Sequence, residues 1–387
     1  MDLLYPAARW ILAVARWMIP TATRQIAFES YPDCSESSFS ILLKILRSRD
    51  CGEFRFYWLA NDPAEAKRVI RSECPDLACR SIGIVSKNSL RGRWIFFRSK
   101  YVFSSHKTYR YAAPGKNQVL VNLLHGMPIK NLGNYDATSG PWAPSSVYSV
   151  ATSDFFRGIV AQAFSLDPHR VLVTGLPRNE WLFEVDVQYW AMREGAARLV
   201  VWLPTFRRCA NEELVRDDTE TDAEDPISVE RLMEIDHALD SCGTLVIVKL
   251  HPLDVKNDRE WPPLRNIRII TMTQANAERL NVYKLLACAD ALVTDYSSVA
   301  IDFLLLRRPI GFYTPDSGFY RRGLIEAVQL RLAVIGVKLA SPNDLVAFLR
   351  SPGNLQGDED KIEELCASEL RSPSSDVLRG VGLERLT

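Results

Sequence analysis

The sequence lacks an excess of charge of either sign. Its 387 residues carry 47 basic and 47 acidic side chains, so the formal net charge is zero. A protein that coats nucleic acid is usually basic overall, so this balance argues against nucleic acid as a partner and leaves room only for a local basic site. The hydrophobic share of 47% and the charged share of 24% fit a folded globular chain and exclude wholesale disorder.

Zinc-binding cysteine motifs are also missing. The chain has 8 cysteines, but none forms a C-x-x-C pair, and no Cys and His cluster has the spacing of zinc ligands. Single cysteines scattered along a long chain are typical of reduced core thiols, which indicates a cytoplasmic compartment. The only D-x-D string, Asp358–Asp360, lies far from the motifs described below. We therefore expect chemistry without a bound metal or other cofactor.

Glycine-rich nucleotide-binding motifs are absent as well. The sequence has no G-x-G-x-x-G and no P-loop, so NAD and Walker-type ATP binding lose support. Its basic residues are mostly arginine, with 35 Arg against 12 Lys. Because the planar guanidinium binds phosphate through two parallel hydrogen bonds, a phosphate-bearing ligand is compatible with a net charge of zero.

Residues 1–23 contain an apolar and aromatic stretch that is interrupted by Arg9 and Arg16. These arginines are seven residues apart, as are Trp10 and Trp17, so a helix would place each pair on one face. This pattern favours an amphipathic helix that lies in a membrane interface, with its arginines towards the headgroups. The alternatives are a helix packed on the protein and a spanning or signal segment, for which the apolar run is short.

Over the rest of the chain, short apolar runs alternate with helix-like patterns. This alternation predicts an α/β fold with parallel sheets, in which the loops after the strands meet along one ligand-facing edge. We expect two Rossmann-like domains that face a cleft, over residues 24–167 and 168–387. The predicted strands are 54–60, 101–104, 119–124, 171–174, 199–203, 244–250, 267–270, 291–294 and 310–313.

The first polar cluster directly after a predicted strand is HGMPIK, from His125 to Lys130. His125 would lie at the ligand-facing edge, where an imidazole can act as a general base near neutral pH. Gly126 lets the backbone turn there and leaves room for a ligand. The alternative is a structural histidine held by hydrogen bonds.

Two further clusters follow strands in the second half of the chain. Thr205 and Arg207 come after the strand at 199–203, and together they predict a phosphate clamp, with an exposed basic loop as the alternative. Lys249 and His251 close the strand at 244–250 and alternate to the same side of it. A lysine near the end of an apolar strand is costly to bury unless it meets an anion.

The fourth cluster consists of Thr294, Asp295, Ser297 and Ser298, between a predicted strand and a predicted helix. One of the two serines would cap that helix, whose first N–H groups form a suitable anion site. Asp302 follows one turn later, where a carboxylate would accept hydrogen bonds from a ribose. Simple helix capping is the alternative interpretation.

Several short motifs occur in a fixed order along the chain. They are FESYPDCSESS (28–38), WLANDP (58–63), HGMPIK, TGLPRNE (174–180), PTFR, KLHP and TDYSSVAIDFLLLRRPIGFYTPD (294–316). Together they resemble the CDP-glycerol glycerophosphotransferase family, the teichoic acid primases and polymerases and their capsule-polymer relatives. The resemblance covers roughly residues 26–320, and its last motif is long and specific.

The resemblance implies a GT-B-like fold with an N-terminal acceptor domain, a C-terminal CDP-donor-binding domain and a cleft between them. It implies a peripheral, monotopic protein on the cytoplasmic face of the cell membrane. Such a protein transfers glycerol phosphate from CDP-glycerol, or ribitol phosphate from CDP-ribitol, to a hydroxyl of a lipid-linked or polymeric glycan, and CMP is released. The implied partners are thus the CDP-polyol, the glycan acceptor and the membrane surface.

The resemblance also implies roles for individual residues. His125 would deprotonate the acceptor hydroxyl, and His251 would contact the donor pyrophosphate and stabilise its charge. Arg178 would belong to an inter-domain Pro-Arg motif with a structural role. The residues expected to hold the donor phosphates and nucleotide are Thr205, Arg207, Lys249, Thr294, Asp295, Ser297, Ser298 and Asp302, with Lys130 and Arg178 as further cleft residues.

Four positions depart from the family pattern. Leu124 and Met127 replace the usual Trp and Thr around the His-Gly pair, Phe206 replaces a Trp, and Glu180 replaces an Asp. The changes beside His125 bear on the acceptor more than on the reaction class. The alternatives are a GT-B glycosyltransferase that uses a nucleotide sugar in surface polysaccharide synthesis, and a non-catalytic membrane-bound scaffold.

Overall fold

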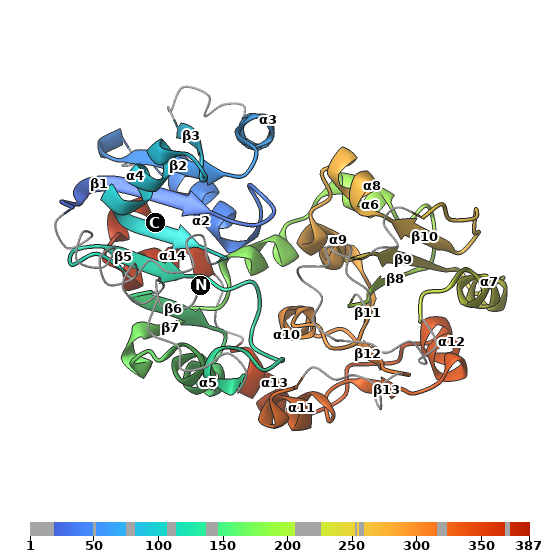
Figure 1. Cartoon of the computed structure of the whole chain (residues 1–387). Coiled ribbons are helices and arrows are strands. Elements are labelled where there is room, and N and C mark those ends of the chain that lie inside the picture. The colour runs from blue at the N-terminus through green and yellow to red at the C-terminus, as the bar shows by residue number, and fades with distance from the viewer. Residues whose placement is uncertain are drawn as a thin grey trace, which may run out of the picture. The chain divides into compact units, whose positions relative to one another are not determined.

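The structure is a computed structural model, and its described residues form two compact units, each built on a parallel sheet (Figure 1). The first unit takes in the chain up to Met127, Leu132–Glu180 and Ala367–Thr387, and the second takes in Pro128–Asn131 and Trp181–Cys366. The amphipathic helix expected within residues 1–23 lies almost wholly outside the described part. The structure describes residues 19–48, 52–74, 82–106, 114–136, 146–205, 226–251, 254, 259–315, 323–367 and 372–387.

The sheet of the first unit has 7 strands in the order β3-β2-β1-β4-β5-β6-β7, and neighbouring strands pair in parallel. The order reverses between β1 and β4, and in open α/β sheets ligands bind beyond the carboxyl ends of the strands at this point. The strands are β1 (Ala22–Glu29), β2 (Arg55–Ala60), β3 (Ile82–Ser86), β4 (Ser99–Ser104), β5 (Val119–Asn122), β6 (Tyr148–Ala151) and β7 (Val171–Val173).

Aromatic side chains fill the core of this unit. Phe28 on β1 stacks on both Trp58 and Phe103, its partners on the two neighbouring strands, with ring centroids 6.4 Å and 5.6 Å apart. All three side chains are fully buried. The helical segments of the unit are α2 (Glu36–Arg47), α3 (Pro63–Glu73), α4 (Leu90–Arg98), η3 (Gly133–Tyr135), α5 (Asp154–Phe164), η4 (Pro168–Arg170), η5 (Pro177–Phe183), which runs on into the second unit, α14 (Pro373–Gly380) and η9 (Glu384–Leu386).

The sheet of the second unit has 6 strands in the order β10-β9-β8-β11-β12-β13, again in parallel, and its order reverses between β8 and β11. Its central strands are almost continuously apolar, as expected where helices cover both faces. The strands are β8 (Arg198–Leu203), β9 (Thr244–Lys249), β10 (Ile267–Ile270), β11 (Ala291–Thr294), β12 (Ile310–Tyr313) and β13 (Val337–Leu339).

Several helices of the second unit begin at residues whose side chains cap them. α8 and α12, for example, start with capping boxes at Thr271 and Ser341. The core of the unit includes Trp202, whose ring meets that of Tyr313 edge-on at 5.6 Å. The helical segments are α6 (Val187–Ala191), α7 (Val229–Ala238), α8 (Met272–Ala277), α9 (Val282–Cys288), α10 (Val299–Phe303), η8 (Leu304–Leu306), α11 (Glu326–Leu332), α12 (Pro342–Arg350) and α13 (Glu359–Leu365).

The prediction of an α/β fold with two parallel sheets is confirmed, but the units divide the chain differently from the expected 24–167 and 168–387. β7 pairs with β6 in the first sheet. The chain also returns to the first unit at Ala367, whose N–H donates to the Thr152 carbonyl oxygen at 3.0 Å. α14, red in Figure 1, consequently lies beside α2 among the blue and cyan elements. An apolar pattern shows that a segment is buried, but not which sheet it joins.

Candidate active site

His125 lies just beyond the carboxyl end of β5. The residues on both sides of it have positive φ angles, 56° for Leu124 and 139° for Gly126, so the backbone turns sharply here. The left-handed conformation is unfavourable for a leucine. It is supported by the Asn122 side chain, which accepts the Leu124 N–H at 3.1 Å. The turn buries Leu124 and leaves the His125 side chain exposed at the edge of the sheet.

A second histidine at this edge, His106, was missed by the sequence analysis. β4 and β5 are neighbours with Ser104 opposite Asn122, so the two strands end at the same level. The imidazoles of His106 and His125 stack with ring centroids 4.8 Å apart and an interplanar angle of 17°. His106 follows the predicted strand at 101–104 much as His125 follows the strand at 119–124. Extending the same rule to every predicted strand would have found it.

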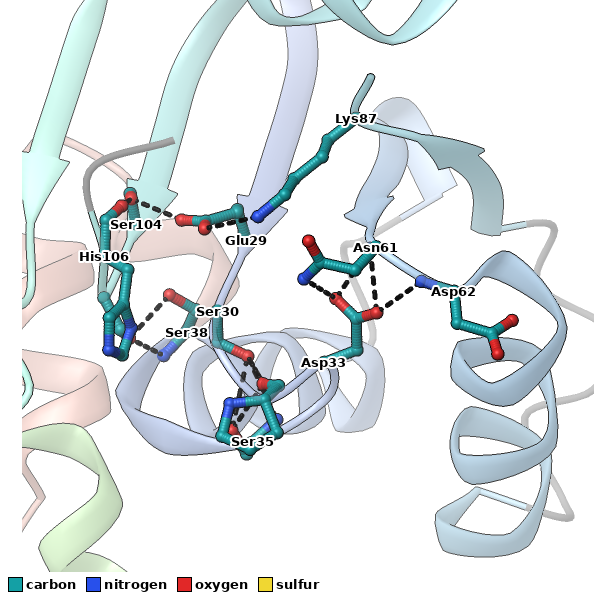
Figure 2. A network of polar contacts seen from close by, with 12 residues as sticks. Glu29, Ser30, Asp33, Ser35, Ser38, Asn61, Asp62, Lys87, Ser104 and His106 are labelled. Carbon is teal, nitrogen blue, oxygen red and sulfur yellow. Dashed lines mark hydrogen bonds and ion pairs between the residues drawn. The ribbon is translucent and has the colours of Figure 1, made fainter. Parts of the chain in front are cut away.

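Glu29 ties together the strand ends beside His106 (Figure 2). It is the last residue of β1 and is 1% exposed. Its carboxylate accepts a hydrogen bond from the Ser104 hydroxyl at 2.6 Å and lies 3.8 Å from Nζ of Lys87. A buried carboxylate needs such partners to offset its desolvation. These contacts fix the ends of β1 and β4, where the strand order of the first sheet reverses.

Burial keeps His106 neutral. Desolvation is the main cause that lowers the pKa of His106 to about 3, and the charges of His125, Arg178 and Lys87 lower it further. The ring of Tyr31 meets that of His106 edge-on at 5.9 Å. Among the described residues, Nδ1 of His106 is buried without a hydrogen-bond partner. His106 therefore presents an uncharged ring face to His125 at neutral pH.

Arg178 is held inside the first unit. It is 3% exposed and forms an ion pair with Glu36 at the start of α2. Two residues later, the Glu180 carboxylate accepts hydrogen bonds from the Ser374 N–H at 2.8 Å and from the Ser374 hydroxyl at 3.0 Å. Burial raises the pKa of Glu180, and these two hydrogen bonds oppose that effect. The segment around Arg178 thus braces η5 against α2 and α14.

Lys130 belongs to the second unit, although His125 belongs to the first. Lys130 pairs with Leu324 in an antiparallel bridge. The Asn131 N–H donates to the Gly323 carbonyl oxygen at 2.8 Å, and the Ile325 N–H donates to that of Ile129 at 2.9 Å. The HGMPIK motif therefore spans the point at which the chain passes from one unit to the other.

Thr205 and Asp295 connect the ends of β8 and β11, where the strand order of the second sheet reverses. Asp295 accepts the Thr205 N–H at 3.1 Å, the Thr205 hydroxyl at 2.9 Å and the Tyr296 N–H at 2.6 Å. The Thr294 hydroxyl donates to the Leu203 carbonyl oxygen at 2.8 Å. Phosphate contacts are predicted for Thr294 and Asp295, and in the structure their side chains bind the neighbouring strand end.

Asp302 lies inside the second unit. It has no exposed surface, and its carboxylate accepts a hydrogen bond from the Tyr283 hydroxyl on α9 at 2.8 Å. The predicted ribose contact would require a rearrangement that exposes this carboxylate. Ser298 is the N-cap residue of α10, as one of the two expected alternatives had it, but its hydroxyl makes no capping bond. The Ser297 hydroxyl accepts the Val299 N–H at 3.4 Å.

Lys249 is the last residue of β9. Its Nζ donates to the Leu250 carbonyl oxygen at 3.1 Å. Burial lowers the pKa of Lys249 to about 8. No ion pair involves Lys249 within the described ranges, so an anionic ligand would relieve its desolvation. His251 follows, half-buried, and its carbonyl oxygen accepts the Asp254 N–H at 3.0 Å.

Arg207 lies in the stretch 206–225, outside the described residues. Within the part of the chain that is described, the structure shows no group of three or more His, Cys, Asp and Glu side chains that could hold a metal ion. The same part contains no helix that is both long and apolar enough to cross a membrane.

Two parallel Rossmann-type sheets with polar residues beyond their carboxyl ends define the α/β class to which GT-B-like proteins belong. Residues 11–363 match the model of the CDP-glycerol:poly(glycerophosphate) glycerophosphotransferase family. The chain belongs to this family.

The fold is similar to that of a solved structure of the wall teichoic acid polymerase TagF, with a TM-score of 0.72 and 19% identity over 97% of this chain and 92% of that one. A more distant structure, the UDP-GlcNAc 2-epimerase from Neisseria meningitidis, has a TM-score of 0.53 and 12% identity over 92% of this chain and 98% of that one. Both likenesses describe the fold alone.

Two curated relatives are named for teichoic acid. The teichoic acid poly(glycerol phosphate) polymerase of Staphylococcus epidermidis is 21% identical over 329 residues, which cover 78% of this chain and 42% of the relative. The teichoic acid ribitol-phosphate primase of Bacillus spizizenii is 26% identical over 227 residues, which cover 53% of this chain and 54% of the relative. The chain thus spans about half the length of these curated relatives.

Proposed function

We propose that the protein transfers glycerol phosphate or ribitol phosphate from a CDP-activated donor to a hydroxyl of a lipid-linked or polymeric glycan, with release of CMP. The observation that carries this proposal is the family match over residues 11–363, within which His125 and His251 both follow strands of the parallel sheets. Both polyols are included because the relatives are named for glycerol phosphate and for ribitol phosphate.

The proposed reaction is a displacement at phosphorus. The acceptor oxygen attacks the β-phosphorus of the donor and forms a new P–O bond, while the bond to the bridging oxygen breaks and CMP leaves with its electron pair. His125 takes the proton of the acceptor hydroxyl, a role worth about 10²–10⁴-fold in rate. Its exposed position at the end of β5 supports this role, because a base must reach its substrate.

The donor is assigned to the second unit. There, His251 would contact the pyrophosphate, and the cation of Lys249 would offset the negative charge that moves onto the leaving CMP. Thr205 is braced by Asp295 at the point where the strand order reverses, so this edge of the sheet is held in place before the donor arrives. Preorganised groups of this kind lower a barrier without having to reorient during the reaction.

We also assign the protein to the cytoplasmic face of the membrane as a peripheral protein. α4 supports this, because it exposes Leu90 by 84% and Trp94 by 51% beside the exposed Arg91 and Arg93. The helix contains no acidic residue. Apolar and aromatic side chains interspersed with arginines are typical of surfaces that enter the headgroup region of a bilayer.

The proposal is tested by incubating the purified protein with CDP-glycerol or CDP-ribitol and a lipid-linked glycan, and measuring CMP and the product mass. We expect CMP release and a mass increase of one or more polyol phosphates. His125→Ala and His251→Ala should each lose about 10²-fold or more of the rate at an unchanged melting temperature. His169→Ala is the control, since His169 is exposed on η4, which precedes β7.

The same assay distinguishes the proposed reaction from the two alternative functions, glycosyl transfer and a non-catalytic scaffold. A mass increase of one sugar from a nucleotide sugar would replace the proposal by glycosyl transfer. Thermal stabilisation by donors with no turnover of any of them would indicate a non-catalytic scaffold, because a bound ligand stabilises the fold whether or not it reacts.

A further inference from the structure

The stacked histidine pair of the first unit has a geometric cause in the sheet. β4 and β5 run in parallel with Tyr101 opposite Val119 and Ser104 opposite Asn122. The loops that follow them therefore leave the same edge side by side. His106 is carried by the first loop and His125 by the second, and their rings meet almost face to face at a 4.8 Å centroid separation.

His106 is the more firmly held of the two rings. Its side chain is half-buried, whereas that of His125 is exposed. The Tyr31 ring meets the His106 ring edge-on. The Ser104 hydroxyl donates to the Glu29 carboxylate and also contacts the backbone carbonyl oxygen of His106. The Glu29 carboxylate is in turn held near Lys87 (Figure 2). The half-buried His106 ring thus stacks on the exposed His125 ring and restricts the planes that the His125 ring can adopt.

We infer that His106 is a positioning residue for the His125 imidazole, acting through the ring stack rather than through contact with a substrate. The inference rests on the proposed function, in which His125 is the general base. A base that is held in one plane loses little freedom when the acceptor hydroxyl binds, and the orientation of a catalytic group affects the rate strongly. The effect of His106 therefore falls on kcat.

Two substitutions separate the stack from the chemistry of the nitrogen atoms. His106→Phe retains an aromatic face against His125 and removes the buried Nδ1, which lacks a partner among the described residues. His106→Ala removes the face itself. We expect His106→Ala to lower kcat by roughly 10–100-fold, and His106→Phe to stay within about threefold of the unmodified enzyme. The KM for the CDP-polyol should change little in either variant.

A double-mutant cycle excludes a merely structural role. If His106 acts through His125, then His106→Ala should cause no further loss of rate in a chain that already carries His125→Ala, because residues that act as one unit are not additive. The exposed His169→Ala should leave the rate unchanged in both backgrounds. Melting temperatures of all variants show whether the fold is retained.

The outcomes are distinct. The inference is wrong, while the proposed function stands, if His106→Ala leaves kcat unchanged. It is also wrong if His106→Ala lowers the rate by the same factor in the unmodified chain and in the chain that carries His125→Ala. If His106→Ala fails to fold, a His106→Phe chain with a kcat below a tenth of the normal value would overturn it as well. Absence of CMP release from the unmodified protein with either CDP-polyol overturns the proposed function, and the inference falls with it.

Discussion

The carboxylate of Asp295 accepts hydrogen bonds from both the backbone N–H and the hydroxyl of Thr205, which lies 90 residues earlier in the chain. Asp295 follows β11 and Thr205 follows β8, the two strands between which the order of the second sheet reverses. The edge of the sheet to which we assign the donor is therefore held together by a buried acid, 7% exposed, that reaches across the reversal point.

Removal of this acid should destabilise the protein. We expect Asp295→Ala to lower the free energy of unfolding by about 2–4 kcal/mol, because it leaves buried N–H donors without an acceptor. Thr205→Val removes only the hydroxyl bond and should cost about 1 kcal/mol. Urea denaturation measures both, with Thr273→Val at an exposed position of α8 as the matched control. Equal stability of Asp295→Ala and the unmodified protein would refute the bracing role.

The sequence predicted the sheets where the strands are apolar throughout. The runs at 199–203, 244–250 and 291–294 correspond to β8, β9 and β11 within one residue. β1 was not predicted, although it lies in the interior of the first sheet, between β2 and β4. Its first half reads Thr-Arg-Gln, and the amide of Gln25 is buried with Ser99 and the Ile95 carbonyl oxygen as its acceptors. Buried polar side chains of this kind interrupt the apolar pattern that marks a strand.

The sequence predicted that the candidate site residues follow strands, but it did not predict which side chains they contact. The rule that chemistry follows a strand located His125, Thr205 and Lys249 at the carboxyl edges of the sheets. This rule does not distinguish a side chain that binds a ligand from one that binds a neighbouring strand or helix. Asp295 accepts hydrogen bonds from Thr205 after β8, and Asp302 accepts one from Tyr283 on α9, and both partners are distant in the sequence. Only the register of the strands and helices brings them together.

The bond between Tyr283 and Asp302 leads to a prediction that opposes the sequence interpretation. Tyr283→Phe removes the hydroxyl that donates to the fully buried carboxylate, so we expect a loss of about 1–3 kcal/mol of stability. The affinity for CDP-glycerol, measured by calorimetry, should stay within about threefold, because Asp302 has no exposed surface. A much weaker affinity for CDP-glycerol at normal stability would instead restore Asp302 as a ribose ligand.

The exposed face of α4 should contribute to membrane binding. We expect Leu90→Ser combined with Trp94→Ser to lower the fraction of protein that sediments with vesicles of phosphatidylglycerol and phosphatidylcholine. Arg91→Glu should do so mainly at low salt, since each arginine near an anionic surface contributes about 1 kcal/mol and is screened by ions. Both the full chain and a chain without residues 1–20 should be measured, so that the N-terminal stretch and α4 are assessed separately.

The control for the vesicle experiment is an apolar pair elsewhere on the surface. Val185 and Val187 are exposed by 85% and 78% in the second unit, with no arginine between them. Changing both to serine removes a comparable apolar surface that lies outside α4. The vesicle binding of this control variant should therefore match that of the unmodified chain. If the α4 variants sediment as fully as this control does, α4 is not a membrane-binding surface.

With the donor assigned to the edge of the second sheet, the lowered pKa of Lys249 should make donor binding depend on proton uptake. Burial lowers that pKa from 10.5 to about 8, so at pH 9 the unoccupied site holds mostly neutral lysine. A pyrophosphate beside it favours the cation, so binding of CDP-glycerol at pH 9 should take up close to one proton, and binding at pH 6.5 should take up almost none. Calorimetry in buffers of different ionisation enthalpy measures this uptake directly.

Two variants identify Lys249 as the group that takes up the proton. Lys249→Arg stays charged at both pH values and should bind the donor without proton uptake, whereas Lys249→Met should bind it more weakly at both.

The pH dependence of unfolding of the ligand-free protein independently checks the sign of the Lys249 pKa shift. Between pH 8 and 10.5 the unfolded chain holds more protons on Lys249 than the folded chain does, so this residue makes the free energy of unfolding rise with pH. Lys249→Met has no such proton and should lack that part of the rise. If donor binding by Lys249→Met is still accompanied by proton uptake at pH 9, the proton goes to another group and the assignment to Lys249 is wrong.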